Sequence, residues 1–301
     1  MNIEELNITH GIAGQLKFFE EKGGLPFIQI TNAKARALIS IYAGQVLSFQ
    51  ALNESDDLMF LSEKAYYQTG KAIKGGAPIC WPWFGAHPVR HDCAPHGFVR
   101  NRLWNVDRTE ITENGDTKIT LKLTDTSETR AIWPQSFLLL LEITVGNSLN
   151  LELITRNTGT QMFSITQAFH TYFKVKDINK VRVLGLSGIS YIDKTDHSIV
   201  KNQVNAVTIN GEVDRIYLDV QGETIIEDIS LNREIHILSR GNKTSVIWNP
   251  WMKISAEMND LRDNDYKHFL CVETANASSD IIKIEPNREF RLVANYRVSN
   301  N

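Results

Sequence analysis

Apolar and polar side chains alternate in the run Ser148-Leu149-Asn150-Leu151-Glu152-Leu153-Ile154-Thr155. Successive side chains of an extended strand point to opposite faces, so the three leucines of this run share one face. A strand with one apolar face is typical of a sheet that is buried on one side and open to solvent on the other. The same period recurs at 118–124 and at 234–240, so half-buried strands are predicted on both sides of the run.

Strand-like composition extends over most of the chain. β-Branched and aromatic residues are enriched at 27–31, 36–42, 46–52, 137–145, 162–169, 181–186, 245–248 and 289–298. Turn-forming clusters such as Glu113-Asn114-Gly115-Asp116 separate these runs, and no amphipathic helix of more than three turns is evident. Strands with one apolar face must stack sheet on sheet to bury it, which predicts an all-β chain. So many strands indicate a large, extended sandwich, with a barrel as the alternative.

The chain of 301 residues is long enough for one large β-domain or for two average domains. It contains no Pro-rich or Ser-rich linker, no low-complexity stretch and no fixed-period repeat, so a single domain over 1–301 is predicted. Hydrophobic residues make up 42% and charged residues 22%, which is typical of a globular protein with a core. A net charge of −3 gives no electrostatic reason to bind nucleic acid or an anionic membrane.

No apolar run approaches the length of about 18 residues that a membrane-spanning helix needs. The strongest run, 137–141, stops at Glu142, and the acidic start of the chain is not a secretory signal. Three cysteines are an odd number in a long chain and predict no disulfide framework, which favours a reducing cytoplasm. No heptad pattern is present, so we expect a monomer.

One stretch combines the residue types that suit a small polar ligand, Lys74-Gly75-Gly76-Ala77-Pro78-Ile79-Cys80-Trp81-Pro82-Trp83-Phe84-Gly85. Glycines allow a backbone to approach a ligand, prolines stiffen the loop, and Trp81 offers a flat apolar face. Lys74, with His96 and Arg100 shortly after the stretch, supplies polar ends that fit a sugar or a sugar phosphate. The alternative is a rigid turn whose tryptophans belong to the core.

Two further polar residues lie in strand-like segments. Alternation in 166–173 places His170 on one face with Tyr172, where an imidazole can donate a proton near neutral pH, although a satisfied structural histidine is the alternative. Glu273 lies in the apolar segment 269–276, where desolvation is expected to raise its pKa and make it a candidate general base. The alternative for this carboxylate is a strand-end glutamate that points into water.

Asp214 and Trp251 complete the candidate binding residues. A short carboxylate such as Asp214 accepts hydrogen bonds from a pair of sugar hydroxyls, but its neighbour Arg215 equally suits a surface ion pair. The segment 249–253 is predicted to be an irregular connection whose Trp251 borders a pocket, or else a solvated loop with a buried tryptophan anchor.

No metal or nucleotide cofactor is predicted. A dense group of candidate metal ligands comprises Cys80, His87, His91, Cys93 and His96. Their spacing contains no C-x-x-C pair and no helical H-x-x-x-H, and prolines interrupt the segment, so a zinc site is disfavoured. The chain also has no G-x-S-x-G motif, no P-loop and no dinucleotide fingerprint, which leaves no visible docking site for ATP or NAD.

Taken in chain order, these motifs resemble those of the hexose-6-phosphate mutarotases (glucose-6-phosphate 1-epimerases) of the aldose 1-epimerase superfamily. The matching segments are 74–85, 96–100, 168–173, 213–215, 248–251 and 272–276. The match extends roughly from 25 to 298, which leaves 1–24 and 299–301 peripheral. The resemblance implies a large galactose-mutarotase-like β-supersandwich with few short helices.

The resemblance also implies a reaction, the interconversion of the α and β anomers of a hexose 6-phosphate, most readily glucose 6-phosphate, without a cofactor. By position, it implies His170 as general acid, Glu273 as general base, Asp214 as a substrate-orienting carboxylate, His96 as a substrate-side histidine, and Lys74 and Arg100 as phosphate-side cations. Alternatives are a mutarotase of unphosphorylated aldoses and a noncatalytic carbohydrate-binding protein. The family usually has arginine at the position of Lys74, and a lysine is a point charge rather than a bidentate fork, so we expect phosphate affinity or sugar choice to differ.

Overall fold

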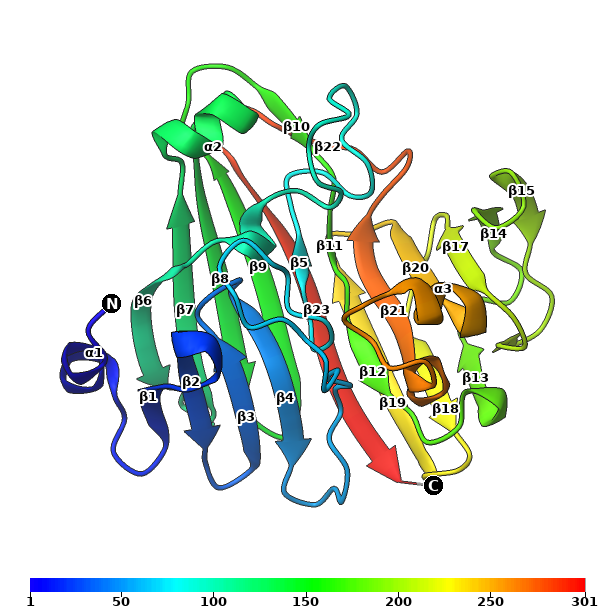
Figure 1. Cartoon of the computed structure of the whole chain (residues 1–301), viewed down its shortest axis with the longest axis horizontal. Coiled ribbons are helices and arrows are strands. Elements are labelled where there is room, and N and C mark those ends of the chain that lie inside the picture. The colour runs from blue at the N-terminus through cyan, green and yellow to red at the C-terminus, as the bar shows by residue number, and fades with distance from the viewer. Residues whose placement is uncertain (301) are drawn as a thin grey trace.

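A nine-stranded antiparallel sheet forms one side of the molecule in the computed structural model, which describes residues 1–300 (Figure 1). Its strands, in spatial order, are β16 (Val207–Thr208), β13 (Val181–Leu184), β18 (Thr224–Asp228), β19 (Arg233–Arg240), β23 (Glu289–Asn300), β9 (Leu149–Asn157), β8 (Phe137–Val145), β7 (Thr117–Thr124) and β6 (Asn105–Ile111). The leucines of 148–155 are buried on one face of β9, so the predicted half-buried strand is confirmed.

An eight-stranded sheet packs against it and carries the candidate site. Its strands, in spatial order, are β15 (Ile199–Asn202), β14 (Ser190–Asp193), β17 (Val213–Tyr217), β20 (Thr244–Asn249), β21 (Phe269–Asn276), β11 (Gln167–Phe169) and β5 (Ile79–Cys80), with β12 (Tyr172–Lys174) also paired to β21. All eight residues of β21 are buried, as expected for a strand that is covered on both faces.

Two smaller sheets complete the strands: β1 (Leu16–Glu20), β2 (Pro26–Thr31), β3 (Ala35–Ser40) and β4 (Gln45–Ala51) in one, and β10 (Phe163–Ile165) with β22 (Ile282–Ile284) in the other. The helices are α1 (Ile3–His10), α2 (Ser127–Ile132) and α3 (Trp251–Glu257), with 3₁₀ turns η1 (Lys22–Gly24), η2 (Val99–Asn101), η3 (Ile178–Lys180) and η4 (Asp265–His268). The predicted all-β fold with few short helices is confirmed. The predicted irregular connection at 249–253 is wrong in part, because α3 begins inside it.

The main core lies between the sheets. Ile39 of β3, Leu151 of β9 and Val272 of β21 belong to one continuous cluster of buried apolar side chains. Figure 1 shows β2, β3 and β4 lying across the β7–β9 part of the nine-stranded sheet. That sheet ends at the edge strands β16 and β6, so the sandwich expectation holds rather than the barrel. The expectation of one domain over 1–301 stays a prediction.

The predicted strand at 162–169 is divided into two. Thr166 lies between β10 and β11, where its backbone N–H donates to the carbonyl of Pro82 at 3.1 Å and its hydroxyl accepts from the N–H of Phe84 at 2.8 Å. At this interruption the chain passes from the two-stranded sheet to the eight-stranded sheet. Among residues 1–300, no helix is both long enough and apolar enough to cross a membrane.

We expect Gly97→Ala to destabilise the fold, because Gly97 has a φ of +74° and an added Cβ would lie 1.7 Å from the carbonyl oxygen of Trp81. The backbone conformation alone costs a non-glycine residue about 1–2 kcal/mol, and the clash adds to that cost. Urea unfolding measures the loss. Gly211→Ala is the matched control, since nothing lies within 4 Å of its added Cβ. Equal stability of the two variants would contradict the tight contact.

Candidate active site

A cavity of about 490 Å³ opens on the outer face of the eight-stranded sheet. Side chains alternate along β21 and β20, so Val272 and Ile247 join the main core whereas Glu273 and Trp248 face the cavity. The remaining walls come from neighbouring strands, from the long connection between β4 and β6, and from the loops that hold Lys194, Met258 and Ser278. The lining residues are Lys74, Phe84, Gly85, Ala86, His96, Arg100, His170, Tyr172, Lys194, Asp214, Ile216, Val246, Trp248, Met258, Glu273 and Ser278.

His170 and Glu273 meet in this cavity although they are distant in sequence. His170 Nε2 lies 3.4 Å from Glu273 Oε1, and their side chains are only 11% and 1% exposed. The pairing of β21 with β11 and β12 explains the contact: Phe169 is opposite Thr274 and Tyr172 is opposite Cys271, so the intervening His170 falls beside Glu273. The backbone N–H of His170 donates to the carbonyl of Pro78 at 2.9 Å, which fixes the link between β11 and β12 that carries the imidazole.

The environment of the pair favours the uncharged form of both side chains. Burial raises the pKa of Glu273 well above its ordinary value, and the Asp214 charge adds to the rise while Arg100 opposes it. Burial lowers the pKa of His170 well below its ordinary value, and the neighbouring basic groups His96, Arg100 and Lys74 lower it further. The raised pKa of Glu273 agrees with the expectation from its apolar strand.

Each member of the pair also has a buried polar atom without a hydrogen-bond partner. These atoms are His170 Nδ1 and Glu273 Oε2. Buried polar atoms in folded proteins are normally hydrogen-bonded, and an unpaired one lowers the stability of the fold. Two such atoms on one cavity wall indicate a site whose hydrogen bonds are completed by a polar ligand.

His96 faces the pair from the β4–β6 connection. Its ring centroid is 5.7 Å from that of His170, at an angle of 74°. The backbone N–H of Gly85 donates to His96 Nδ1 at 3.3 Å, so the hydrogen of the neutral ring is assigned to Nε2. Burial, then Arg100 and Lys74, lower the pKa of His96 to about 3. His96 is therefore a neutral hydrogen-bond donor at physiological pH.

Aromatic rings hold the imidazole of His170 in place. Tyr172 stacks on it with centroids 5.0 Å apart and ring planes at 14°, and Trp248 contacts its edge at 5.6 Å. The shared face of His170 and Tyr172 was predicted from strand alternation and is confirmed. Behind the site, Thr171 points the other way and its hydroxyl bonds to Tyr296 Oη of β23 at 2.7 Å.

Charged groups line the rest of the cavity. Lys74 Nζ lies 3.5 Å from Asp260 Oδ2. Arg100 donates from Nη2 to the carbonyl of Pro95 at 3.0 Å, while its buried Nε has no partner. Burial raises the pKa of Asp214, opposed by the charge of Lys194. Lys194 was not predicted as a site residue, because it lies in a turn without a distinctive motif.

Two predicted binding residues lie elsewhere, and this corrects the expectation for both. Trp81 is fully buried in the main core, where its Nε1 donates to Thr155 Oγ1 at 3.1 Å. Trp251 begins α3 and packs on the ring of Tyr266 at 5.1 Å. Neither lines the cavity. The tryptophan that does is Trp248, and its orientation follows from alternation with the core residue Ile247 on β20.

The crowded Cys and His residues of 80–96 do not converge. Across residues 1–300, no group of three or more His, Cys, Asp or Glu side chains is arranged to hold a metal ion. His87 Nδ1 instead accepts from the backbone N–H groups of Val89 and Arg90, at 3.1 and 2.9 Å, and so stabilises a turn. The three cysteines are all free thiols.

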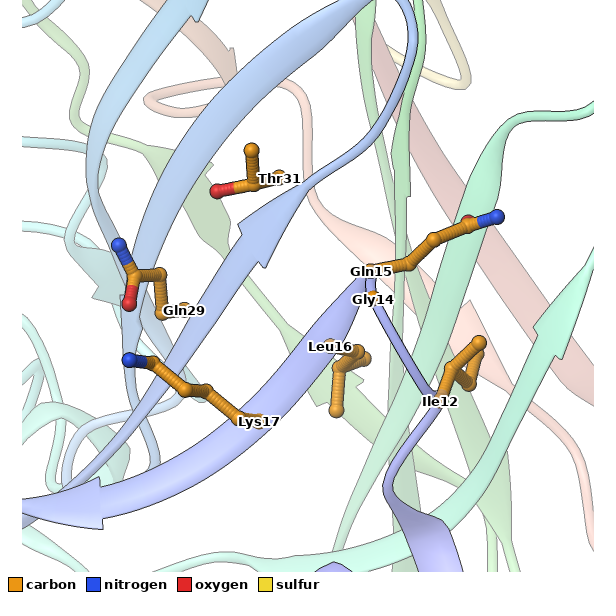
Figure 2. Close-up of a pocket in the computed structure, with 7 residues that line it drawn as sticks. All are labelled: Ile12, Gly14, Gln15, Leu16, Lys17, Gln29 and Thr31. Carbon is orange, nitrogen blue, oxygen red and sulfur yellow. The ribbon is translucent and has the colours of Figure 1, made fainter.

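A second hollow lacks the paired acid and base of the candidate site. This hollow has a volume of about 360 Å³. Figure 2 shows the residues that line it, on and beside β1 and β2: Ile12, Gly14, Gln15, Leu16, Lys17, Gln29 and Thr31. Lys17 is the only titratable side chain in its lining, so the hollow has no acid–base pair. The cavity around His170 and Glu273 is therefore the candidate active site.

Comparison with known proteins gives consistent results. A family model described as aldose 1-epimerase matches residues 26–297. A protein of Cenchrus ciliaris named "Putative glucose-6-phosphate 1-epimerase" is 38% identical over 264 residues, covering 85% of this chain and 79% of the relative. A protein of Escherichia coli (strain K12) with the same name is 34% identical over 277 residues, 91% of each chain. The crystal structure of a "putative mutarotase" from Salmonella typhimurium matches with a TM-score of 0.90 and 30% identity, over 97% of this chain and 96% of that chain.

We expect Glu273→Gln to stabilise the fold, and the gain to grow with pH. The folded-state pKa of Glu273 lies well above its ordinary value, so above that ordinary value the folded chain holds a proton that the unfolded chain releases. The unfolding free energy of the wild type therefore falls as pH rises towards the folded-state pKa, by up to about 1.4 kcal/mol per pH unit. Glutamine does not ionise and has no such loss.

Urea unfolding of both proteins between about pH 5 and about pH 8 measures this difference. Glu257→Gln, at an exposed helix position, is the matched control and should keep the pH dependence of the wild type. A gain that stays constant across this pH range would mean that Glu273 is already ionised in the folded state.

Proposed function

Because the chain belongs to the aldose 1-epimerase family, we propose that it interconverts the α and β anomers of a hexose 6-phosphate, with glucose 6-phosphate as the preferred substrate. The single observation that carries the proposal is the contact between His170 and Glu273 in a cavity that also contains Lys74 and Arg100. The names of the two relatives support the choice of substrate.

Anomers exchange when the sugar ring opens and closes again on the other face of C1. A base removes the proton from the C1 hydroxyl, an acid protonates the ring oxygen, and the bond between C1 and the ring oxygen breaks to leave an aldehyde. We assign the base to Glu273 and the acid to His170. Both oxygens are bonded to C1 and so lie side by side, which suits two side chains with facing atoms 3.4 Å apart. After the aldehyde turns, closure reverses both transfers.

For the assigned roles, Glu273 must be deprotonated and His170 protonated when the ring opens. The pKa shifts favour protonated Glu273 beside neutral His170. Transfer of that proton to His170 across the existing contact gives the carboxylate and the imidazolium without changing the net charge. Sugar hydroxyls that donate to the unpartnered Glu273 Oε2 stabilise the carboxylate, so substrate binding favours the reactive form.

The other lining residues have distinct proposed roles. Asp214 accepts hydrogen bonds from sugar hydroxyls away from C1, and His96 donates one from Nε2, which leaves C1 free to turn. Trp248 offers an apolar face to the ring. Lys74 and Arg100 bind the 6-phosphate, and the unpartnered Arg100 Nε is available for that contact. The side chains supply both proton transfers, so the proposed reaction needs no cofactor. We further propose that the enzyme is a cytoplasmic monomer.

Removal of either member of the pair should abolish most of the catalysis. For His170→Asn and Glu273→Gln, we expect the rate of anomer exchange to fall by about 10² to 10⁴, because each removes one proton-transfer group. Exchange NMR on glucose 6-phosphate, corrected for the spontaneous rate, gives the rate. Glu257→Gln is the control and should exchange anomers like the wild type. Wild-type rates in both site variants would rule out the assigned roles. No exchange above the spontaneous rate in the wild type would fit a noncatalytic carbohydrate-binding protein.

Removal of a phosphate-side cation should discriminate between substrates. For Arg100→Ala we expect the KM for glucose 6-phosphate to rise about 10- to 100-fold, since a charged hydrogen bond is lost, and the KM for glucose to change little. Lys74→Ala should act in the same direction. Polarimetry on both sugars measures the two constants. An equal change for both sugars would indicate a mutarotase of unphosphorylated aldoses instead.

A further inference from the structure

One cation of the candidate site already has a carboxylate partner. Lys74 Nζ lies 3.5 Å from Asp260 Oδ2 and 3.9 Å from Met258 Sδ, and the Lys74 and Asp260 side chains are 18% and 21% exposed. The other two cations of the lining differ: no carboxylate oxygen lies within 4 Å of Arg100 or Lys194 among residues 1–300. Lys194 Nζ instead donates to Ser198 Oγ at 3.2 Å.

We propose that Asp260 is an internal competitor for the substrate phosphate and thereby sets how strongly the site prefers phosphorylated over plain sugar. The inference rests on the proposed function and deepens it. Asp260 forms an ion pair with Lys74. When a sugar phosphate binds, Lys74 turns to the phosphate and gives up the Asp260 contact, so the net gain from this cation is the difference between two ion pairs.

The chemistry of lysine makes the exchange possible. Its ammonium is a point charge on a flexible stem and accepts a new partner by rotation, whereas an arginine fork holds a carboxylate in fixed bidentate geometry. A phosphate monoester carries a charge of about −1.5 to −2 near neutral pH and attracts Lys74 more strongly than one carboxylate does. The same phosphate repels Asp260, because the carboxylate remains close to it.

The position of Asp260 beside the cavity is fixed by the turn that carries it. It lies in a turn after α3 that is closed by a hydrogen bond from the N–H of Leu261 to the carbonyl of Met258, at 3.1 Å. Leu261 is buried, with 1% of its surface exposed, and Met258 lines the cavity. The turn is anchored on both sides of Asp260, so the carboxylate stays near the cavity when Lys74 leaves it.

Asp260→Asn tests the proposal, because it removes the competing charge and keeps the size of the side chain. We expect the KM for glucose 6-phosphate and the Kd for inorganic phosphate to fall about two- to fivefold, the range that a partly exposed ion pair allows. The KM for glucose should stay unchanged. Exchange NMR gives the two KM values, and isothermal titration calorimetry with inorganic phosphate alone gives the Kd without relying on activity.

Two further variants isolate the cause. Asp263→Asn makes the same chemical change at an exposed residue of the same loop, and it should leave all three constants as in the wild type. In a Lys74→Ala background, Asp260→Asn should lose most of its effect on the glucose 6-phosphate and phosphate constants, because the cation for which the groups compete is gone.

Several results would overturn the inference. A rise in the KM for glucose 6-phosphate in Asp260→Asn would mean that Asp260 positions Lys74 for the phosphate. Unchanged constants, or the same gain from Asp263→Asn, would mean that Asp260 has no specific effect. Failure of the proposed function looks different, since wild-type protein would then exchange glucose and glucose 6-phosphate with equal KM or would exchange neither.

Discussion

The site depends on the backbone pairing of β21 with the two short strands β11 and β12. Hydrogen bonds in this antiparallel ladder fix Phe169 opposite Thr274 and Tyr172 opposite Cys271. The same register places the two residues between the short strands, so His170 lies beside Glu273. The chain thus joins a histidine and a glutamate from distant parts of the sequence through main-chain geometry. A slip of one residue would turn Glu273 into the core and remove it from the cavity.

The burial of ionisable side chains in the candidate site lowers the stability of the fold. A carboxyl and an imidazole are buried in contact, each retains an unpartnered polar atom, and a second histidine with a strongly lowered pKa lies nearby. Buried polar atoms without partners lower the stability of a fold, so the arrangement fits a site that binds a polar ligand. The surrounding strands supply enough buried apolar surface to keep the protein folded in spite of it.

The all-β class and most long strands were predictable from the sequence, because their alternating pattern reflects burial on one face. The predicted bounds of β8, for instance, agree with the structure. Short strands such as β15, whose residues are mostly exposed, carry no such pattern and were missed. The residue types around Trp81 predicted that it contacts the sugar. A flat apolar side chain suits a hydrophobic core equally well, and only the three-dimensional packing shows that Trp81 belongs to the core. Lys194 could not be found because its turn has no local signature.

The hydrogen bond between Thr171 and Tyr296 gives the site a mechanical connection to the far side of the molecule. Thr171 follows the candidate acid directly, and Tyr296 belongs to the long strand at the middle of the opposite sheet. The two layers are therefore coupled by a polar tether as well as by apolar packing. The main chain next to His170 is thus held to the opposite sheet as well as to its own, which limits how far the imidazole can shift relative to the core.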